Sequence, residues 1–268
     1  MEYTPTSPQR IVCLTEETTE MLYILGEQDR IVGISGFTVR PPEARREKPR
    51  VSAFTSAKID RILELDPDLV LGFSDLQAEI ALDLIRKGLN VHIFNQRSLK
   101  EILDMIVMLG AMVNARQRAE VWIEQVRLKI TAMSAENAVQ TTRPRVYFEE
   151  WDNPMISGIR WVSELIEIAG GQDCFQELSG SALAKDRIIA DPAEVVRRAP
   201  DIIVGSWCGK KFQPESVAAR PGWQEIPAVS NNRVYEIKSP YILQPGPAAL
   251  TDGLDQMHAI IKDWYRIA

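Results

Sequence analysis

The sequence predicts an α/β protein of two lobes, each with a parallel sheet, joined by one long helix. Three observations predict this fold. Short apolar runs alternate with helical patterns along most of the chain, which is typical of βα units. A similar unit of helix, Pro-Asp and apolar strand occurs once in each half. Between the halves, residues 98–139 have a helical pattern without a turn cluster.

The first half begins with alternating strands and helices. Strands are expected at residues 10–14, 31–34, 68–73 and 90–94. Helices are expected at residues 15–25, 58–65 and 75–87. Thr15 supplies an oxygen for the N-cap of the first helix, and Gly26 is a typical stop. Between Ser35 and Ala57, three prolines indicate a long connection, which is unusual in a compact domain unless it has a function.

One helix to Gly110 and then a long amphipathic helix are expected across the middle of the chain. Apolar residues recur there at helical spacing, namely Trp122, Val126, Ile130 and Met133. This helix divides the chain into three expected parts. They are an N-terminal α/β lobe at residues 1–112, an interlobe helix at 113–140 and a C-terminal α/β lobe at 141–268.

The second half repeats a unit of the first. Residues 58–75 are KIDRILELDPDLVLGFSD and residues 191–208 are DPAEVVRRAPDIIVGSWC. In both, a helix ends before Pro67 or Pro200, because proline disfavours the helical region for the residue before it. The apolar strand that follows should be covered on both faces, as in parallel sheets. Further strands are expected at 146–149 and 234–237, and further helices at 162–169 and 248–265.

Composition excludes several classes of partner. The formal net charge of -6 and the pI near 5.2 give no basic surface for nucleic acid. The apolar runs are too short or too interrupted to span a bilayer. The opening MEYTPTSPQR has no signal-peptide pattern, so a cytoplasmic location is expected if Met1 is the native start. A periplasmic location is the alternative if an export segment was omitted.

Catalytic and metal-binding patterns are scarce. The chain has two histidines, His92 and His258, too few for an imidazole metal site and poorly placed for a catalytic triad. Its three cysteines form no C-x-x-C pair, which argues against a disulfide framework or a zinc site. GSWCGKK at residues 205–211 lacks the spacing of a phosphate-binding loop. We therefore expect a protein that binds a ligand without catalysis.

Candidate ligand-binding residues follow the predicted strands. Open α/β sheets bind ligands at the carboxyl ends of their strands, and two such lobes would hold a ligand in the cleft between them. In the first half these positions hold Thr15, Glu16, Glu17, Phe37, Phe54, Phe73 and Ser74. In the second half they hold Glu149, Glu150, Trp151, Trp207, Cys208 and Tyr241. The aromatic residues suggest a wall for a large, flat, partly apolar ligand.

The chain resembles a known superfamily over nearly its whole length. RIVCLTEETTEMLYILGEQDRIVGIS and VSAFTSAKIDRILELDPDLVLGF resemble the N-terminal lobe of cobalamin-binding and iron-chelate-binding components of ABC importers. FEEWDNPMISGIRWVSELIEIAGG resembles their C-terminal lobe. These proteins are the helical-backbone (class III) periplasmic binding proteins, and the cobalamin type is the nearest. The resemblance implies two Rossmann-like lobes, an architecture shared with chelatases.

The resemblance also implies the function. We expect reversible binding of a cobalamin-like corrinoid or a related metal chelate, with no intrinsic cofactor or bound metal. Phe54 stands where cobalamin binders pack an aromatic ring on the corrin, and Trp151 and Trp207 fall in matching loops. Glu16 and Glu17 stand where relatives tend to carry small residues, and their charge disfavours an anionic siderophore. A ferric-siderophore or haem binder is the alternative, and a chelatase-like enzyme with a histidine facing the cleft is the third.

The expected partner is an ABC permease if the protein is an importer component, whereas a cytosolic relative of such a component would instead hold, hand on or sense a corrinoid. Members of the superfamily dock on their permease through one carboxylate per lobe. Glu79 matches in the first lobe, and Glu215 in the second, with Glu225 as the alternative. The resemblance further implies a monomer that does not insert into the membrane.

Overall fold

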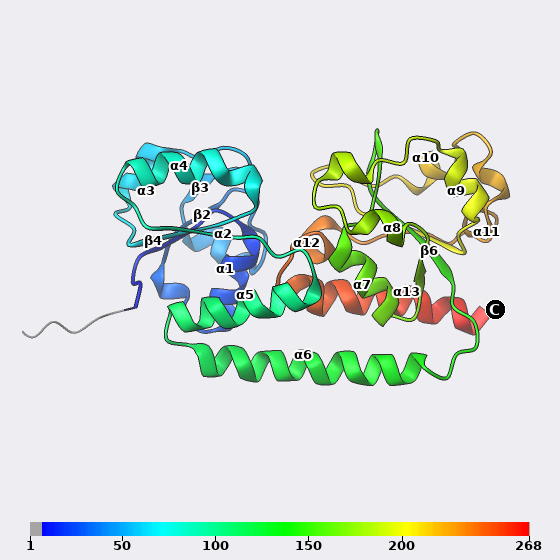
Figure 1. Cartoon of the computed structure of the whole chain (residues 1–268), viewed down its shortest axis with the longest axis horizontal. Coiled ribbons are helices and arrows are strands. Elements are labelled where there is room, and N and C mark those ends of the chain that lie inside the picture. Colours follow the sequence, from blue (N-terminus) through cyan, green and yellow to red (C-terminus); the bar gives the residue numbers. More distant parts are fainter. Residues whose placement is uncertain (1–6, 268) are drawn as a thin grey trace, which may run out of the picture. The chain divides into compact units, whose positions relative to one another are not determined.

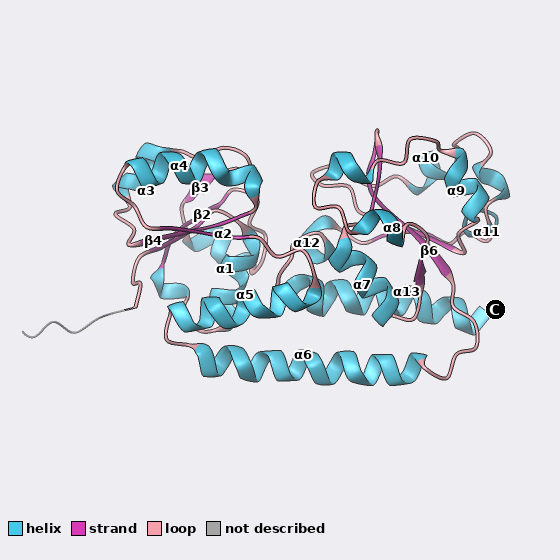
Figure 2. Ribbon diagram, viewed as in Figure 1, coloured by secondary structure: helices cyan, strands magenta, loops and turns pink. Residues whose placement is uncertain are grey.

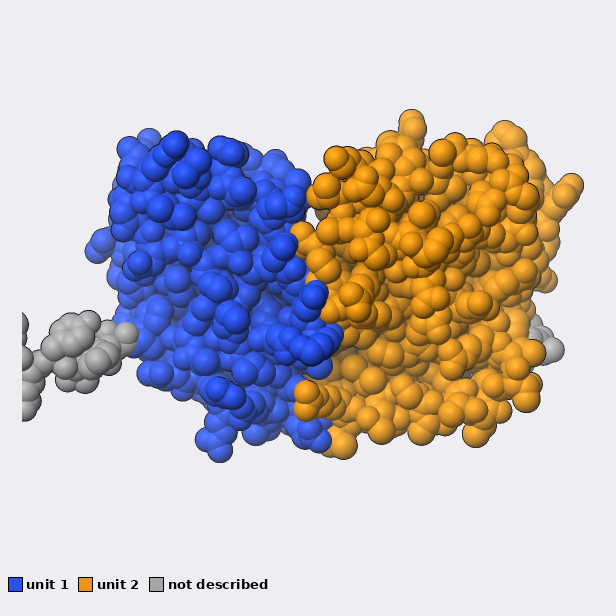
Figure 3. Space-filling view, in the orientation of Figure 1, with its two compact units in different colours: residues 1–96, 100–125 blue, residues 97–99, 126–268 orange. Residues whose placement is uncertain are grey.

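The structure, a computed structural model, describes residues 7–267. The chain forms two compact units (Figure 3). The first extends to Gln96 and includes Lys100–Gln125, and the second comprises Arg97–Leu99 and the chain from Val126 onward. Each unit contains one five-stranded sheet between helices, so the predicted α/β fold with parallel sheets is confirmed (Figure 2).

The first sheet is entirely parallel and has the strand order β3-β2-β1-β4-β5. Its strands are β1 (Ile11–Cys13), β2 (Ile31–Ser35), β3 (Arg50–Ser52), β4 (Leu69–Phe73) and β5 (Val91–Phe94). Its helical elements are α1 (Glu16–Ile24), η1 (Gln28–Arg30), α2 (Pro42–Glu47), α3 (Ile59–Glu64), η2 (Asp75–Gln77) and α4 (Ala78–Arg86). Figure 1 shows α3 and α4 on one side of the sheet and α1 on the other. The order of strands reverses between β1 and β4, the position where such sheets bind ligands.

The central strands β1 and β4 of the first sheet are buried because helices cover both faces. Every residue of β4 is buried, as its unbroken apolar sequence predicted. The prediction of a long connection between Ser35 and Ala57 was wrong, because this segment contains α2 and β3. Proline fits the first turn of α2, and β3 is a three-residue edge strand with one apolar side chain, too short to give a periodic pattern.

The second sheet has the order β10-β9-β6-β7, and β8 pairs with the beginning of β6. Its strands are β6 (Arg145–Asp152), β7 (Met155–Ser157), β8 (Gln172–Asp173), β9 (Ile202–Gly205) and β10 (Val234–Glu236). All pairs are parallel except β6 with β7. β7, β8 and the polar end of β6 were not predicted from the sequence. Residues 150–152 were expected to form a loop after the strand. They instead continue β6 and form a hairpin with β7, with Asn153 and Pro154 at the turn.

Helices cover both faces of the second sheet as well. They are α7 (Arg160–Ile168), α8 (Gln176–Ser179), η3 (Ala184–Arg187), α9 (Ala193–Arg198), α10 (Pro214–Ala218), η4 (Trp223–Glu225), α11 (Pro227–Ser230), α12 (Ser239–Ile242) and α13 (Leu254–Ile267). In Figure 1, α7 and α13 lie on one side and α9 and α10 on the other. The last helix, expected from residue 248, begins with a π-helical turn at Ala249–Gly253.

Two consecutive helices, α5 (Leu99–Met112) and α6 (Arg116–Asn137), follow the first sheet, as predicted (Figure 1). Asn114 has φ +59° in the turn between them, a conformation that asparagine tolerates well. Along α6, Ile123, Val126 and Met133 are buried. The division between the two units falls within this helix, between Gln125 and Val126.

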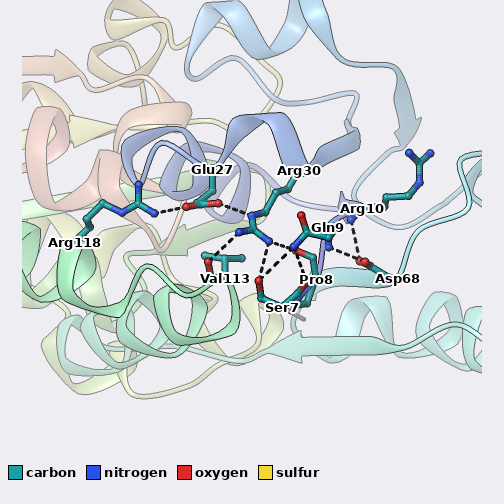
Figure 4. A network of polar contacts seen from close by, with 9 residues as sticks. All are labelled: Ser7, Pro8, Gln9, Arg10, Glu27, Arg30, Asp68, Val113 and Arg118. Carbon is teal, nitrogen blue, oxygen red and sulfur yellow. Dashed lines mark hydrogen bonds and ion pairs between the residues drawn. The ribbon is translucent and has the colours of Figure 1, made fainter. Parts of the chain in front are cut away.

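A polar network holds the start of α6 within the first unit (Figure 4). Glu27 pairs with both Arg30 and Arg118, and its side chain is 12% exposed. Arg30 also donates to the Ser7 hydroxyl at 2.9 Å and to the Pro8 carbonyl at 2.5 Å. The network therefore joins the N-terminal segment, η1 and α6.

The repeated unit has the same backbone in both halves. Asp66 and Ala199, the residues before the two prolines, have φ of 44° and 45°. Asp68 accepts hydrogen bonds from the backbone N–H groups of Gln9 and Arg10 at 2.7 and 3.0 Å. Its counterpart Asp201 accepts one from the N–H of Arg145 at 2.8 Å. In each unit the Pro-Asp carboxylate thus fixes the start of the first strand.

Candidate functional site

The candidate site in the first unit begins where β1 ends. Thr15 is the N-cap of α1, although its side chain makes no capping bond. Its hydroxyl instead donates to Glu17 Oε1 at 2.6 Å. The hydroxyl of Thr19 donates to the Thr15 carbonyl at 3.2 Å. These contacts fix the first turn of α1 at the point where the strand order reverses.

Glu16 and Glu17 are buried in this turn, with 7% and 1% of their surface exposed. Burial and repulsion from Glu17 raise the pKa of Glu16 to about 8. Burial raises the pKa of Glu17 to about 7, although the Thr15 hydroxyl opposes this rise. The neighbouring Glu20 pairs with Arg40 at 2.8 Å. Within residues 7–267, Oε1 of Glu16 and Oε2 of Glu17 have no hydrogen-bond partner.

The predicted aromatic residues of the first unit differ in exposure. Phe37, after β2, is 55% exposed, Phe54, after β3, is half-buried, and Phe73 at the end of β4 is buried. Ser74 is buried with φ +68°, and its hydroxyl accepts from the N–H of Leu76 at 3.2 Å. Phe37 and Phe54 can therefore offer ring surface, whereas Phe73 and Ser74 shape the loop.

Gln77 connects the loops of the first unit, and it was not predicted as a site residue from the sequence. Its amide donates to the carbonyls of Phe54 and Leu14 at 3.0 and 3.4 Å and accepts from the N–H of Phe73 at 3.0 Å. Gly72 leaves room for this side chain, because a Cβ there would lie 2.6 Å from Gln77 Oε1. The signal was a serine followed three residues later by a glutamine, a capping-box spacing.

In the second unit, Glu149 lies buried at the end of the paired part of β6 and β9. It accepts hydrogen bonds from the Tyr147 hydroxyl at 2.9 Å and from Trp207 Nε1 at 3.1 Å. Arg220 binds it with two nitrogens, at 2.5 and 2.9 Å. Arg220 also stacks on the Trp223 ring at 4.5 Å. Sequence reasoning missed Arg220, since nothing in the local pattern marks a partner so far along the chain.

Glu150 is also paired. Arg187, which is 1% exposed, donates to its two oxygens at 2.6 and 3.0 Å. The next residue, Trp151, is half-buried and donates from Nε1 to the Asn153 carbonyl at 3.0 Å. The carboxylates of this face therefore already have cationic partners within the unit.

The loop after β9 brings a lysine to two indole rings. Lys210 Nζ lies 5.5 Å from the Trp151 ring centroid and 4.7 Å from that of Trp207. It also pairs with Asp152 at 2.5 Å. Trp207 is 4% exposed and packs edge-on against Phe212 with ring centroids 4.9 Å apart. Trp151 therefore offers more ring surface than Trp207 does.

The remaining predicted residues are placed as follows. Cys208 is exposed after Trp207, and Tyr241 is half-buried on α12. Glu79 on α4 and Glu215 on α10 are exposed, as is Glu225 in η4. Exposure is compatible with docking, and the docking role stays a prediction. The two histidines lie in β5 and α13, and burial lowers the pKa of both. Across residues 7–267, no helix is both long and apolar enough for a bilayer.

These observations describe two sheets with polar and aromatic residues at the carboxyl ends of their parallel strands. A family model described as "Periplasmic binding protein" matches residues 11–241. The chain belongs to this family. The resemblance seen in the sequence is thereby confirmed, and the periplasmic binding protein family is one of solute-binding proteins.

Relatives agree with this membership. A vitamin B12-binding protein from Vibrio parahaemolyticus is 25% identical over 246 residues, covering 90% of this chain and 86% of the relative. An uncharacterized ABC transporter substrate-binding lipoprotein, YvrC of Bacillus subtilis, is 25% identical over 270 residues, covering 97% of this chain and 82% of the relative.

Solved structures share the fold of this family member. The periplasmic vitamin B12 binding protein BtuF of Vibrio cholerae has a TM-score of 0.76 at 22% identity, covering 98% of this chain and 100% of its own. A possible iron-binding protein of Staphylococcus epidermidis has a TM-score of 0.80 at 20% identity, covering 96% and 99%. The predicted two-lobed fold is therefore confirmed.

Proposed function

We propose that this periplasmic binding protein binds a cobalamin-like corrinoid, or a closely related flat metal chelate, reversibly and without chemical change. The observation that carries the proposal is the half-buried Trp151 beside Lys210, at the carboxyl end of the second sheet. An indole ring in this position suits the apolar face of a macrocycle. The relatives named as vitamin B12-binding proteins favour a corrinoid over other chelates.

The first unit supports the same ligand class. Phe37 and Phe54 offer further ring surface after β2 and β3. Above about pH 8, where Glu16 and Glu17 are charged, they disfavour an anionic ferric siderophore. Calorimetric titration with cyanocobalamin, haemin and a ferric hydroxamate tests the proposal. We expect heat of binding with cyanocobalamin, and its absence would overturn the corrinoid assignment.

We further propose that the protein delivers its ligand to an ABC permease and performs no catalysis. YvrC, a relative named as an ABC transporter substrate-binding lipoprotein, supports this role. Exposed Glu79 and Glu215 are the proposed docking carboxylates. Their reversal to lysine should abolish ligand-stimulated ATPase activity of the reconstituted permease and leave ligand affinity unchanged. Subcellular fractionation distinguishes the cytoplasmic and periplasmic locations expected from the sequence.

A further inference from the structure

Two adjacent buried carboxyl groups at the end of β1 are only partly hydrogen-bonded. Glu16 receives a bond from the backbone N–H of Val39, and Glu17 receives one from the Thr15 hydroxyl at 2.6 Å. Their other oxygens, Oε1 of Glu16 and Oε2 of Glu17, have no partner among residues 7–267. Glu16 is 7% exposed and Glu17 is 1% exposed. Buried carboxyl oxygens normally accept at least one hydrogen bond, so each of these two oxygens lacks a donor, which residues 7–267 do not supply.

We propose that Glu16 and Glu17 determine ligand specificity by accepting hydrogen bonds from N–H groups at the edge of the macrocycle and by excluding a macrocycle whose edge carries carboxylates. This inference rests on the proposed function, because it requires a flat macrocyclic chelate. The edge of a cobalamin-type corrin carries primary amides, whereas the edge of haem carries propionates. A primary amide has two N–H donors, which can serve two carboxyl oxygens.

The surrounding charges favour this selection. Glu20 adds a third carboxylate on the same helix, and Arg40 pairs with it at 2.8 Å. Arg45 on α2 is near enough to stabilise the charged form of Glu16. Repulsion from Glu17 and Glu20 acts in the opposite direction and destabilises that charged form. An anionic ligand edge would meet further repulsion in a poorly hydrated site. In the second unit, by contrast, Arg220 and Arg187 already occupy the carboxylates.

The protonation of Glu16 and Glu17 makes the proposed discrimination between ligands depend on pH. Burial raises the pKa of Glu16 to about 8 and that of Glu17 to about 7. Below these values the groups hold protons and can themselves donate to a ligand carboxylate. Above them they are charged and repel it. Cys13 beneath the pair stays protonated, since burial raises its pKa to about 12. Discrimination against a carboxylate edge should therefore increase as the pH rises.

Two corrinoids that differ mainly at their edge test the proposal. Dicyanocobinamide carries amides, and dicyanocobyrinic acid carries carboxylates on the same ring. Cyanide on both faces of cobalt keeps the exposed Cys208 from coordinating the metal. Calorimetry on the full chain at about pH 8.5 should show at least about 10-fold tighter binding of the amide form. Near pH 6 the ratio of the two dissociation constants should be about 3-fold or less.

Variants identify the residues responsible. The double variant Glu16→Gln with Glu17→Gln should reduce the ratio at about pH 8.5 to about 3-fold or less, because the charges are gone. Glu64→Gln, at an exposed position on α3, removes one charge elsewhere in the unit and should keep the full ratio. Thermal unfolding shows whether each variant is folded. If the double variant does not fold, the pH dependence of the unmodified chain decides.

The outcomes separate this inference from the proposed function. Failure of the unmodified chain to bind either corrinoid would overturn both. Binding of both with equal affinity at the two pH values would overturn the specificity of the glutamate pair and leave the proposed function standing. A ratio that persists in the folded double variant, or that disappears in Glu64→Gln, would also overturn it.

Discussion

Each unit has a pair of adjacent glutamates near the carboxyl end of the parallel part of its first strand, in the first turn of α1 and within β6, yet the pairs differ in their partners. In the second unit, Glu149 and Glu150 are each bound by an arginine through two nitrogens. In the first unit, Glu16 and Glu17 each keep a buried oxygen without a partner among residues 7–267. One pair is therefore neutralised within its unit, and the other pair is the one that we propose contacts the ligand.

The difference shows that a position in the fold does not fix the role of a residue. Both pairs lie near the carboxyl end of the parallel part of a central strand, where ligands bind in sheets of this kind. The second unit supplies Arg220 and Arg187 from distant segments, and these neutralise the charges. We therefore expect polar selectivity from the first unit and mainly aromatic contact from the second.

The largest expected effect is the loss of Arg220. Arg220→Met leaves the fully buried Glu149 without its cationic partner, which should reduce the free energy of unfolding by about 3–5 kcal/mol. Urea unfolding followed by tryptophan fluorescence measures this, since Trp223 lies against the arginine. Arg197→Met, which removes the exposed ion pairs of Arg197 with Asp191 and Glu194, should change stability little. Equal losses in the two variants would contradict a structural role for Glu149.

The second prediction concerns the first unit, where removal of a glutamate charge should increase the free energy of unfolding at alkaline pH instead of reducing it. The pKa of Glu17 rises from 4.5 to about 7, which corresponds to about 3 kcal/mol. A raised carboxyl pKa contributes stability fully below about pH 4.5, and this contribution is lost as the pH rises through about 7. Glu17→Gln should therefore unfold less readily than the unmodified chain at about pH 9 and show no advantage near pH 4.

Glu150→Gln is the matched control for this sign reversal. The same chemical change in the second unit weakens the bond to the buried Arg187, so it should lower stability at neutral pH. Chemical unfolding of both variants across the pH range compares them directly. Destabilisation by Glu17→Gln at alkaline pH would show that its carboxylate has partners comparable to those of Glu150.

The third prediction tests whether aromatic contact and polar selectivity come from different residues of the binding site. Trp151→Ala should weaken the amide-bearing and carboxylate-bearing corrinoids alike, by about 1–3 kcal/mol, because it removes ring contact and no charged group. Phe54→Ala should do the same in the first unit. Isothermal titration gives both affinities. A Trp151 variant that changes the ratio between the two corrinoids would assign polar selectivity to the second unit as well.

Much of the fold could be predicted from the sequence because its signals are local. A proline before an apolar strand predicted the repeated unit, and the helical spacing of apolar residues predicted α5 and α6. Elements with weak patterns escaped prediction, such as the three-residue β3 and the polar end of β6. The same holds for the site. The glutamates and aromatic residues follow predicted strands, but their partners Arg187 and Arg220 come from distant segments, and only the fold brings them together.

The smallest expected effect concerns Glu27, a carboxylate of the first unit that does have cationic partners. Burial opposes its ionisation, but hydrogen bonds from Arg30 and Arg118 lower its pKa. Its stabilising contribution should therefore be present at neutral pH and disappear as the pH falls through this lowered pKa. Glu27→Gln should cost about 1–2 kcal/mol at neutral pH, measured by urea unfolding.

A variant of Glu27 tests why the two glutamate pairs differ in their effect on stability. The cause is either the unit in which a carboxylate lies or the presence of arginine partners. If partners decide, Glu27→Gln should destabilise the first unit, as Glu150→Gln does the second, and Glu17→Gln should remain the exception. Glu43→Gln, which removes an exposed carboxylate 3.6 Å from Arg46, is the control and should have little effect. A Glu27 variant as stable as the Glu43 variant would mean that carboxylates in the first unit contribute little even when paired. The open oxygens of Glu16 and Glu17 would then no longer distinguish them as ligand-binding groups.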